Sequence, residues 1–330
     1  MPEGARVGRP RVPELDGVRG IAVLLVVAAH AGGVHLAGGG AIGVGLFFVL
    51  SGYLITRLLL RELAGRGQID LRRFWERRAR RLVPAFLVFT ALLTVLLATA
   101  GRLDRLWILA ALPVADYTAA LGVDLYPADH VWSLAVEEQF YLTWPFILAW
   151  VSTRRRPLRW VIGAATLMTG WRVGAALAGW NDWVYHSLDG NAYALLFGAC
   201  LAIAGTRLSG AAGTVALLSV IALAGVPPTG RIWLAVVVPA AAGASAVLIA
   251  GARGVPGLAW APLRLVGRVS YGWYLYHYPV MVLLPEEAHV ARWAVAMLTF
   301  GLAVLSWRFV EQPVLNGTWL SRRSRVVPSS

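Results

Sequence analysis

Lysine is absent from the sequence, so its formal net charge of +13 comes from arginine alone. Cysteine is almost absent too. Cys200 is the single one, which excludes an intramolecular disulfide framework and a metal site built on cysteine. The six histidines show neither HxxxH nor HExxH spacing, so we expect no bound metal.

Charged residues are scarce throughout the chain. They make up 14% of its 330 residues, against 58% hydrophobic residues and a mean hydropathy of +0.65. Soluble domains carry about 25% charged residues, so this composition indicates a protein that lies mostly in a lipid bilayer. The arginines lie in short loops between apolar runs, which is typical of membrane topology signals and gives no support to a nucleic-acid partner.

Apolar windows of about 20 residues predict an all-α, polytopic integral membrane protein. Ten transmembrane helices are expected, at 18–36, 42–60, 82–100, 132–151, 160–178, 188–205, 210–226, 232–250, 265–284 and 290–310. With both termini in the cytoplasm, 25 of the 30 arginines fall in cytoplasmic segments or at the cytoplasmic ends of the spans, as the positive-inside rule requires. An eleventh helix at 106–121 would break this pattern, so we interpret 101–131 as an outer segment, either irregular or a re-entrant helix.

We expect one membrane domain over residues 1–330, forming a multi-pass protein of the plasma membrane. Its basic ends, 1–12 and 318–330, are predicted to be flexible tails. The longest polar stretch, 61–81, is too short to predict a soluble domain. No fixed-period repeat suggests the inverted halves of many transporters.

The first apolar run places an arginine and a histidine on one helical face. Arg19 and His30 are eleven residues apart, which returns to nearly the same face about 16 Å further along a helix. Asp16, one turn before Arg19, is placed either to orient the guanidinium or to cap the helix. An imidazole at this depth is costly unless it faces a polar cavity, so His30 marks a candidate site.

A dense arginine cluster precedes the third predicted span. Arg78 and Arg81 lie one turn apart at the membrane edge, with Arg73 and Arg77 close by. The planar guanidinium binds phosphate through two parallel hydrogen bonds, so the cluster suits a phosphorylated donor. The alternative is a positive anchor to anionic lipid, which the spacing alone slightly favours.

Two later spans carry further polar groups. Ser133 and Glu137 share a helix face near the outer end of the fourth span, and Glu137 is either a site residue or a buried tie between helices. His277 is expected about 18 Å from the cytoplasmic side. It lies beside the Tyr278–Pro279 bond, where proline frees a backbone carbonyl.

Arg172 and Asp189 are the remaining charges within or at the rim of the spans. They either line a route for a polar substrate or pair with each other. Together with Ser133 and Tyr141, we treat them as candidates for substrate binding.

Six motifs, in order, resemble the acyltransferase type 3 family of membrane enzymes. They are PELDGVRGIAVLLVVAAH at 13–30, GVGLFFVLSGYLI at 43–55, RRARRLVP at 77–84, WSLAVEEQFYLTWP at 132–145, YGWYLYHYP at 271–279 and VEQP at 310–313. Each motif alone is weak. The ordered set spans nearly the whole chain and is highly specific.

The resemblance implies an O-acyltransferase that takes an acyl group from cytoplasmic acyl-coenzyme A, with acetyl-coenzyme A as the expected donor. The implied acceptor is a hydroxyl of an envelope glycan, a lipid-linked sugar or a secondary metabolite such as a macrolide-like compound. In this family the first motif supplies the catalytic histidine, here His30, with Arg19 as its partner; we count Asp16 with them. The resemblance also brings Glu137 and His277 into the site.

The donor phosphates are expected at Arg78 and Arg81, with Arg73 and Arg77 beside them. From there the pantetheine arm is long enough to bring the thioester to the depth of His30. This histidine then takes the proton of the acceptor hydroxyl, or carries the acyl group itself. The rival interpretation is a transporter or flippase for a polar or lipid-linked molecule, with the same charges lining its path.

Overall fold

The computed structural model describes residues 12–32, 37–99, 101, 113–282, 284–285 and 288–316. Within these ranges it contains helices and no strands, so the all-α prediction is confirmed for them. Apart from Val12, the two predicted tails lie outside the described residues. So do His35 and residues 102–112 of the predicted outer segment.

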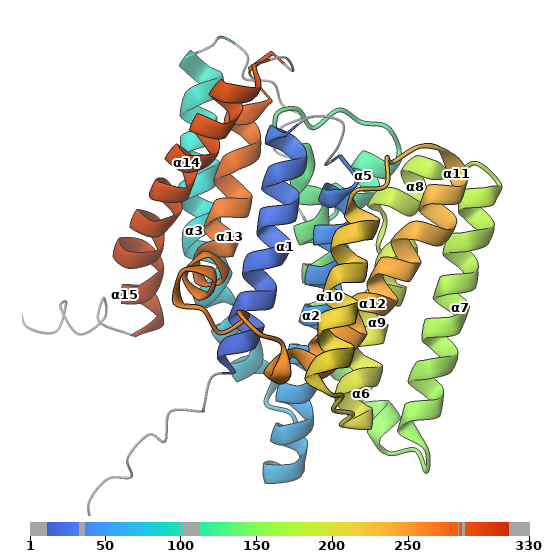
Figure 1. The fold of residues 1–330 in the computed structure, drawn as a ribbon. Helices are drawn as coiled ribbons and strands as arrows, with labels where there is room; N and C mark the ends of the chain where they lie inside the picture. The colour runs from blue at the N-terminus through green and yellow to red at the C-terminus, as the bar shows by residue number, and fades with distance from the viewer. Residues whose placement is uncertain are drawn as a thin grey trace, which may run out of the picture.

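Long helices make up most of the fold (Figure 1). They are α1 (Pro13–Ala31), α2 (Gly39–Arg66), α3 (Leu71–Thr99), α6 (Trp132–Ser152), α7 (Pro157–Leu177), α9 (Leu188–Ala204), α10 (Gly210–Ala224), α12 (Val238–Gly251), α13 (Ala261–Met281) and α14 (His289–Ser306). Short helical segments join or extend them: α5 (Ala115–Ala120), η2 (Asp129–Val131), α8 (Asn181–His186), α11 (Gly230–Ile232), η3 (Trp233–Val237), η4 (Ala252–Gly254), η5 (Trp307–Glu311) and α15 (Gln312–Leu315). Each predicted span overlaps one of the long helices.

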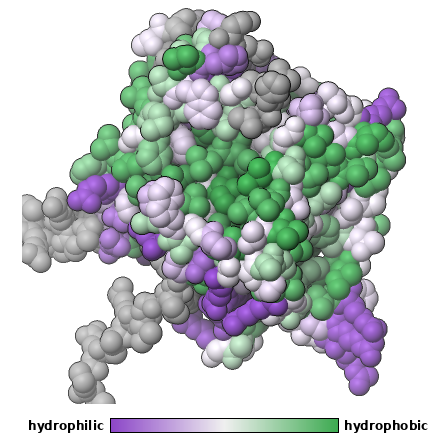
Figure 2. All heavy atoms as spheres, in the orientation of Figure 1, coloured by the Kyte–Doolittle hydropathy of each residue, from purple (hydrophilic) through white to green (hydrophobic). Residues whose placement is uncertain are grey.

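Five helical segments of the described chain are long and apolar enough to cross a membrane by length and composition. They cover Gly39–Arg66, Leu71–Thr99, Asn181–Ala204, Gly230–Gly254 and His289–Leu315. Figure 2 shows hydrophobic residues across the middle of one face and hydrophilic residues gathered most densely at its lower edge. The number of ten spans and the cytoplasmic placement of both termini stay predictions.

Helix α1 begins five residues earlier than predicted and also ends earlier. Pro13 stands in its first turn, where a missing N–H costs nothing and the fixed φ favours a helix. At the other end the N–H of Gly32 bonds to the carbonyl of Ala28 at 2.7 Å. The helix therefore spans Pro13–Ala31 instead of 18–36, and Arg19 lies in its second turn.

Helix α3 also begins before its predicted span, because the arginine-rich stretch is itself helical. Its buried positions Phe74, Ala85, Phe89 and Leu93 are separated by eleven, four and four residues, which places them on one face. Arg78 and Arg81 extend this face, because each is four or seven residues from Phe74 and Ala85, whereas Arg72, Arg73 and Arg80 are exposed. The charged stretch and the apolar span are thus one continuous helix, Leu71–Thr99.

Helix α1 lies at the centre of the fold, packed against α13 on one side and α2 on the other (Figure 1). Helix α2 packs in turn on α9, and α13 packs on α14. The α1–α13 approach is close, because a Cβ at Gly267 would overlap the carbonyl oxygen of Asp16. Small residues permit such contacts between membrane helices, and this one holds α13 beside Arg19.

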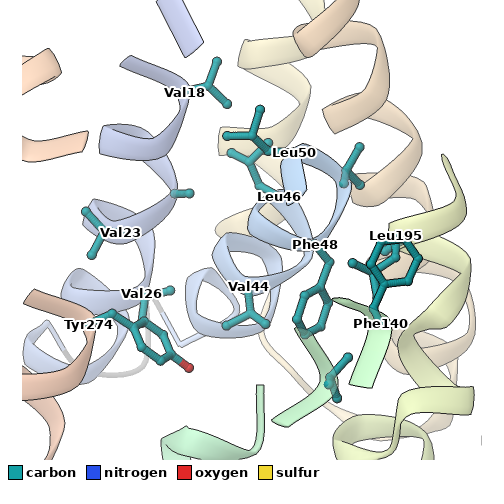
Figure 3. Close-up of a cluster of buried hydrophobic side chains, with 14 of the residues drawn as sticks. Val18, Val23, Val26, Val44, Leu46, Phe48, Leu50, Phe140, Leu195 and Tyr274 are labelled. Carbon is teal, nitrogen blue, oxygen red and sulfur yellow. The ribbon is translucent and has the colours of Figure 1, made fainter. Parts of the chain in front are cut away.

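Buried apolar side chains from several helices meet beside α1. Figure 3 shows Val26 of α1, Val44 and Phe48 of α2, Phe140 of α6 and Tyr274 of α13 around one region. Phe48 and Tyr193 of α9 are each 1% exposed. This tight packing fixes the helices whose polar residues form the site.

Candidate active site

A basic cavity lies at the end of the fold where α1 begins. It holds about 400 Å³ that the centre of a water molecule can reach, and we call it the arginine cavity. Its lining is Val12, Leu15, Asp16, Arg19, Leu54, Arg57, Leu58, Arg61, Arg81, Arg268, Trp307, Glu311 and Leu315. Among these described residues five arginines face two acidic side chains, so the cavity suits a polyanion such as a phosphorylated molecule.

Two guanidinium nitrogens in this cavity make no hydrogen bond within the described residues, although one of them, Nε of Arg268, lies 3.9 Å from the Asp16 carboxylate. The Nε atoms of Arg19 and Arg268 are buried without a hydrogen bond among the described residues. A buried donor without a partner costs about 1–3 kcal/mol, and an anion that accepts its hydrogen bond removes that cost. The cavity therefore meets the chemical requirement for binding phosphate.

Asp16 plays neither of the two predicted roles. The N-cap of α1 is Val12, and no side chain caps the helix. The Asp16 carboxylate forms an ion pair with Arg268 of α13 at 3.9 Å and none with Arg19. The early start of α1 explains the difference, since it moves Asp16 from the helix end into the first turn, facing α13.

A second cavity adjoins the first. It holds about 50 Å³ and is lined by Arg19, Val44, Phe47, Phe48, Ser133, Leu134, Glu137, Ser270, Tyr271 and Tyr274; we call it the middle cavity. Arg19 lines both cavities. The hydroxyl oxygens of Ser133 and Tyr274 lie 2.6 Å apart, so the predicted position of Ser133 in the site agrees with its place in this lining.

A third cavity lies at the other end of α1. It holds about 140 Å³ and is lined by Val26, His30, Gly40, Val44, Asp129, His130, Trp132, Tyr185, His186, Tyr274 and Tyr278; we call it the histidine cavity. Val44 and Tyr274 line both this cavity and the middle one. The three cavities therefore form a row beside α1, running from the basic end past Arg19 to His30.

His30 and His277 are in direct contact. Nδ1 of His30 lies 3.0 Å from Nε2 of His277, although the two residues are 247 positions apart in the chain. Nδ1 of His277 lies 3.0 Å from the carbonyl oxygen of Trp273 and 2.8 Å from that of Tyr274. Since carbonyl oxygens only accept, Nδ1 of His277 carries the hydrogen.

This contact assigns the ring hydrogens of the pair when both rings are neutral. With its hydrogen on Nδ1, His277 has a lone pair on Nε2, which accepts the Nδ1–H of His30. The free lone pair of His30 is then on Nε2. A histidine held this way by a second group is arranged to remove a proton from a hydroxyl.

A third buried histidine lies beside this pair. Nε2 of His130 donates to the carbonyl oxygen of Leu275 at 3.2 Å. That carbonyl is free because Pro279, four residues later in α13, has no N–H to offer it. The proline thus frees a backbone carbonyl as predicted, and His130 donates a hydrogen bond to it.

Glu137 lies with the arginines, away from the histidine pair. It accepts a hydrogen bond from the hydroxyl of Tyr141 at 2.8 Å, and the guanidinium of Arg78 stacks 4.8 Å from the centre of the Tyr141 ring. No hydrogen bond joins Glu137 to His30 in the described chain. Glu137 and Tyr141 therefore connect the middle cavity with α3.

The four predicted donor arginines lie in different places. Only Arg81 lines the arginine cavity. Arg78 stacks on Tyr141, Arg77 forms an ion pair with Glu62 at 3.4 Å, and Arg73 is exposed on α3. Because successive residues of a helix point about 100° apart, neighbours in this cluster cannot all face one cavity.

Arg172 and Asp189 do not pair with each other. Arg172 is 1% exposed and donates to the carbonyl oxygens of Val184 at 2.6 Å and Gly190 at 2.7 Å. Asp189 accepts from the ring nitrogens of two tryptophans at 2.7 and 2.9 Å. Neither residue lines the three cavities, and the Arg172 bonds tie α7 to the α8–α9 junction.

Sequence reasoning missed several lining residues. Arg57 and Arg61 have the i, i+4 spacing of one helix face at the basic end of α2, a signal that was available. Arg268 lies just before the motif at 271–279 and Glu311 lies within the motif at 310–313, but only the packing places both at the cavity. His130 stands just before the Trp132 motif, where it reads as a loop residue. Among the described residues no group of histidine, cysteine and acidic side chains is arranged to hold a metal ion.

Comparison with known proteins agrees with these features. A family model described as an acyltransferase domain matches residues 12–314. The chain is 31% identical to peptidoglycan O-acetyltransferase OatA of Listeria monocytogenes, over 97% of this chain and 58% of that protein. It is also 31% identical to the putative peptidoglycan O-acetyltransferase YrhL of Bacillus subtilis, over 96% of this chain and 56% of that protein.

A more distant relative is O-acetyltransferase OatA of Staphylococcus aureus, 29% identical over 92% of this chain and 57% of that protein. The chain thus spans somewhat more than half the length of these curated relatives. No solved structure matches it. The family match covers almost all of the described residues and includes every residue that lines the three cavities except Leu315, and on this basis the chain belongs to the acyltransferase type 3 family.

Proposed function

We propose that this chain is a plasma-membrane O-acyltransferase. It takes an acyl group, acetyl in the simplest case, from acyl-coenzyme A bound in the arginine cavity. It passes the group to a hydroxyl of an acceptor in the histidine cavity. The family match and the O-acetyltransferase names of the relatives support this reaction class.

The row of three cavities is the observation that carries the proposal. A donor with phosphates needs positive charge, and the arginine cavity supplies it at one end. A proton acceptor is needed where the hydroxyl attacks, and His30 lies at the other end. Arg19 and Tyr274 are shared between neighbouring cavities, so the two ends belong to one site.

In the reaction, the acceptor oxygen attacks the thioester carbonyl carbon while Nε2 of His30 takes the hydroxyl proton. The carbon–sulfur bond breaks, and the proton leaves with the coenzyme A thiol. His277 holds His30 in the required tautomer through the 3.0 Å contact. An alternative order has His30 acylated first and discharged onto the acceptor afterwards.

The proposed acceptor is a glycan hydroxyl of the cell envelope, as the names of the relatives suggest. Lipid-linked sugars and secondary metabolites also carry hydroxyl groups and are alternative acceptors. The proposed orientation, with the arginine cavity toward the cytoplasm, would give the donor access from inside the cell. One membrane domain with ten spans and cytoplasmic termini completes the proposal.

Mass spectrometry of envelope glycans, lipids and secreted metabolites, with and without the protein, tests this function. An acceptor that gains an acyl group only when the protein is present supports it and identifies both the acceptor and the chain length. Purified protein in nanodiscs should also release coenzyme A from acetyl-coenzyme A when that acceptor is added. Movement of a solute across vesicles without coenzyme A release would support the transporter interpretation instead.

A further inference from the structure

The histidine cavity differs from the arginine cavity in what it can recognise. Among its described lining residues there is no arginine, and aromatic rings of Trp132, Tyr185 and Tyr278 make up much of the wall. Polar and apolar surface contribute about equally to this lining. The polar groups therefore contribute to what binds.

His130 supplies an unused hydrogen-bond acceptor to this cavity. Its Nε2–H is committed to the carbonyl oxygen of Leu275, so in the neutral ring Nδ1 has a lone pair. His130 is 5% exposed, and its Nδ1 is buried without a hydrogen bond among the described residues. Unpaired polar atoms are rare in protein interiors and call for an explanation.

His30 and His130 lie against the same aromatic ring. The centre of the Tyr278 ring is 4.9 Å from that of His30 and 4.8 Å from that of His130. Both histidines line the cavity, and the ring hydrogens assigned above give His30 a lone pair on Nε2. Two histidines that contact the same tyrosine ring, each with a lone pair not used within the described chain, thus line a cavity that has no arginine among its described lining residues.

We propose that the histidine cavity binds a neutral, polyhydroxylated acceptor such as a sugar ring, and that His130 orients it. One hydroxyl of the acceptor donates to Nε2 of His30 and is acylated. A second hydroxyl of the same molecule donates to Nδ1 of His130 and is not acylated. This inference rests on the proposed function and adds a specificity-determining residue, His130, to it.

The charge of the cavity supports a neutral ligand. Two imidazole lone pairs repel an anionic group, and Asp129 in the same lining adds no positive charge. A hydroxyl donates a hydrogen bond without carrying charge, so hydroxyl groups match both lone pairs.

Two substitutions separate the proposed role of Nδ1 of His130 in binding the acceptor from the hydrogen bond between Nε2 of His130 and Leu275. In His130→Gln the side-chain amide reaches the position of Nε2 and keeps a donor for Leu275, but the acceptor at Nδ1 is lost. In His130→Asn the amide oxygen takes the position of Nδ1, and the bond to Leu275 is lost. The two side chains are similar in size. His130→Gln keeps the bond to Leu275 and loses the acceptor, whereas His130→Asn keeps the acceptor and loses the bond to Leu275.

The probe is triacetylchitotriose, a neutral oligosaccharide, titrated calorimetrically into the protein in nanodiscs. Loss of one hydrogen bond predicts that His130→Gln binds it about 3- to 10-fold more weakly than wild type, while His130→Asn stays within about 2-fold. Coenzyme A affinity should be unchanged in both, since it reports on the distant arginine cavity. Equal affinities for wild type and His130→Gln, equal losses in both variants, or no binding by wild type would each overturn the proposal.

Monodeoxy analogues of the trisaccharide decide the question if His130→Gln does not fold. The wild-type protein should bind about 3- to 10-fold more weakly when one particular hydroxyl, other than the acylated one, is removed from the trisaccharide. Equal affinities for all the monodeoxy analogues would contradict the inference. Wild type that binds the trisaccharide through His130 but transfers no acetyl group to any glycan would leave this binding role intact. In that case the proposed function would be the part that fails.

Discussion

The arginine cavity and the histidine cavity lie at opposite ends of α1 and differ in every chemical respect. The first has arginines from four helices and buried guanidinium nitrogens without a hydrogen bond in the described chain. The second has histidine and other aromatic rings, the carboxylate of Asp129 and one buried acceptor without a partner among the described residues. One helix carries a residue of each, Arg19 and His30, so the eleven-residue spacing sets how far apart the two chemistries lie.

This difference teaches how one site can serve two unlike substrates. The proposed function assigns the charged donor to the basic end, where arginines attract phosphate, and the lone pairs of the other end repel it. It assigns the neutral acceptor to the histidine end, where two imidazole nitrogens can accept hydrogen bonds from hydroxyls. Variants at the two ends should therefore separate donor binding from acceptor chemistry.

The largest effect is expected at His30. In His30→Ala, acyl transfer should fall by about 10²- to 10⁴-fold, because the proposed base or acyl carrier is gone. Coenzyme A affinity, measured by calorimetry, should stay the same. His289→Ala is the matched control, since His289 is exposed at the start of α14; an active His30→Ala would remove the basis of the mechanism.

A smaller effect is expected at the basic end. Arg81→Ala should weaken coenzyme A binding by roughly 10- to 100-fold, the range for a hydrogen bond to a charged group. The affinity for a neutral glycan should not change. Arg72→Ala is the control, because Arg72 is exposed and paired with Glu76 at 3.0 Å. If both variants bind the donor like wild type, the arginine cavity is not its site.

A third pair of variants examines the contact between the two histidines. His277→Gln keeps an acceptor near the position of Nε2, whereas His277→Asn keeps the donor toward Trp273 and loses that acceptor. We expect kcat to fall about 10-fold or more in His277→Asn and less in His277→Gln, with KM for the donor unchanged. The opposite order would show that the bonds to the α13 carbonyls matter more than the tautomer of His30.

The smallest effect concerns Asp116, in the short helix α5 near the histidine-cavity end. Asp116 is fully buried and accepts hydrogen bonds from Gln139 at 2.7 Å and from the N–H of Leu188 at 3.2 Å. Burial raises its pKa above the usual 3.8, so the folded state holds this proton more tightly than the unfolded state. Stability should therefore fall as the pH rises from about 3.8 through the raised pKa.

The measurement is the midpoint of thermal unfolding across that pH range in wild type and Asp116→Asn. The variant should lose this part of the pH dependence, a change of roughly a few °C. Parallel curves for the two proteins would contradict the assignment to Asp116. Acyl transfer should be affected less than in any variant above.

Much of this architecture follows from local patterns in the sequence. Apolar windows locate the helices, and the spacing of Arg19 and His30 places both on the inner face of α1. The position of Pro279 predicts a free carbonyl in α13. These properties depend only on residues within one helix.

The parts that were not predicted depend on packing between helices. The contact of His30 with His277 joins residues 247 positions apart, and only the family resemblance brought the two together beforehand. The arginine cavity draws on α1, α2, α3 and α13, so no single run of sequence displays it. Arg81 was found because it lies in the dense cluster, whereas Arg268 has only Arg264 near it in α13.

The missing amide hydrogen of Pro279 has a consequence beyond the shape of α13. It leaves the carbonyl oxygen of Leu275 free to accept a hydrogen bond from Nε2 of His130. Nδ1 of His130 is then the nitrogen that has no hydrogen-bond partner among the described residues. If His130 orients the acceptor as proposed, the main chain of α13 therefore determines which hydrogen bond this histidine offers to it. A Pro279→Ala substitution would return the oxygen to the α-helical ladder and allow the imidazole to present a donor in place of an acceptor, without altering any side chain of the cavity wall.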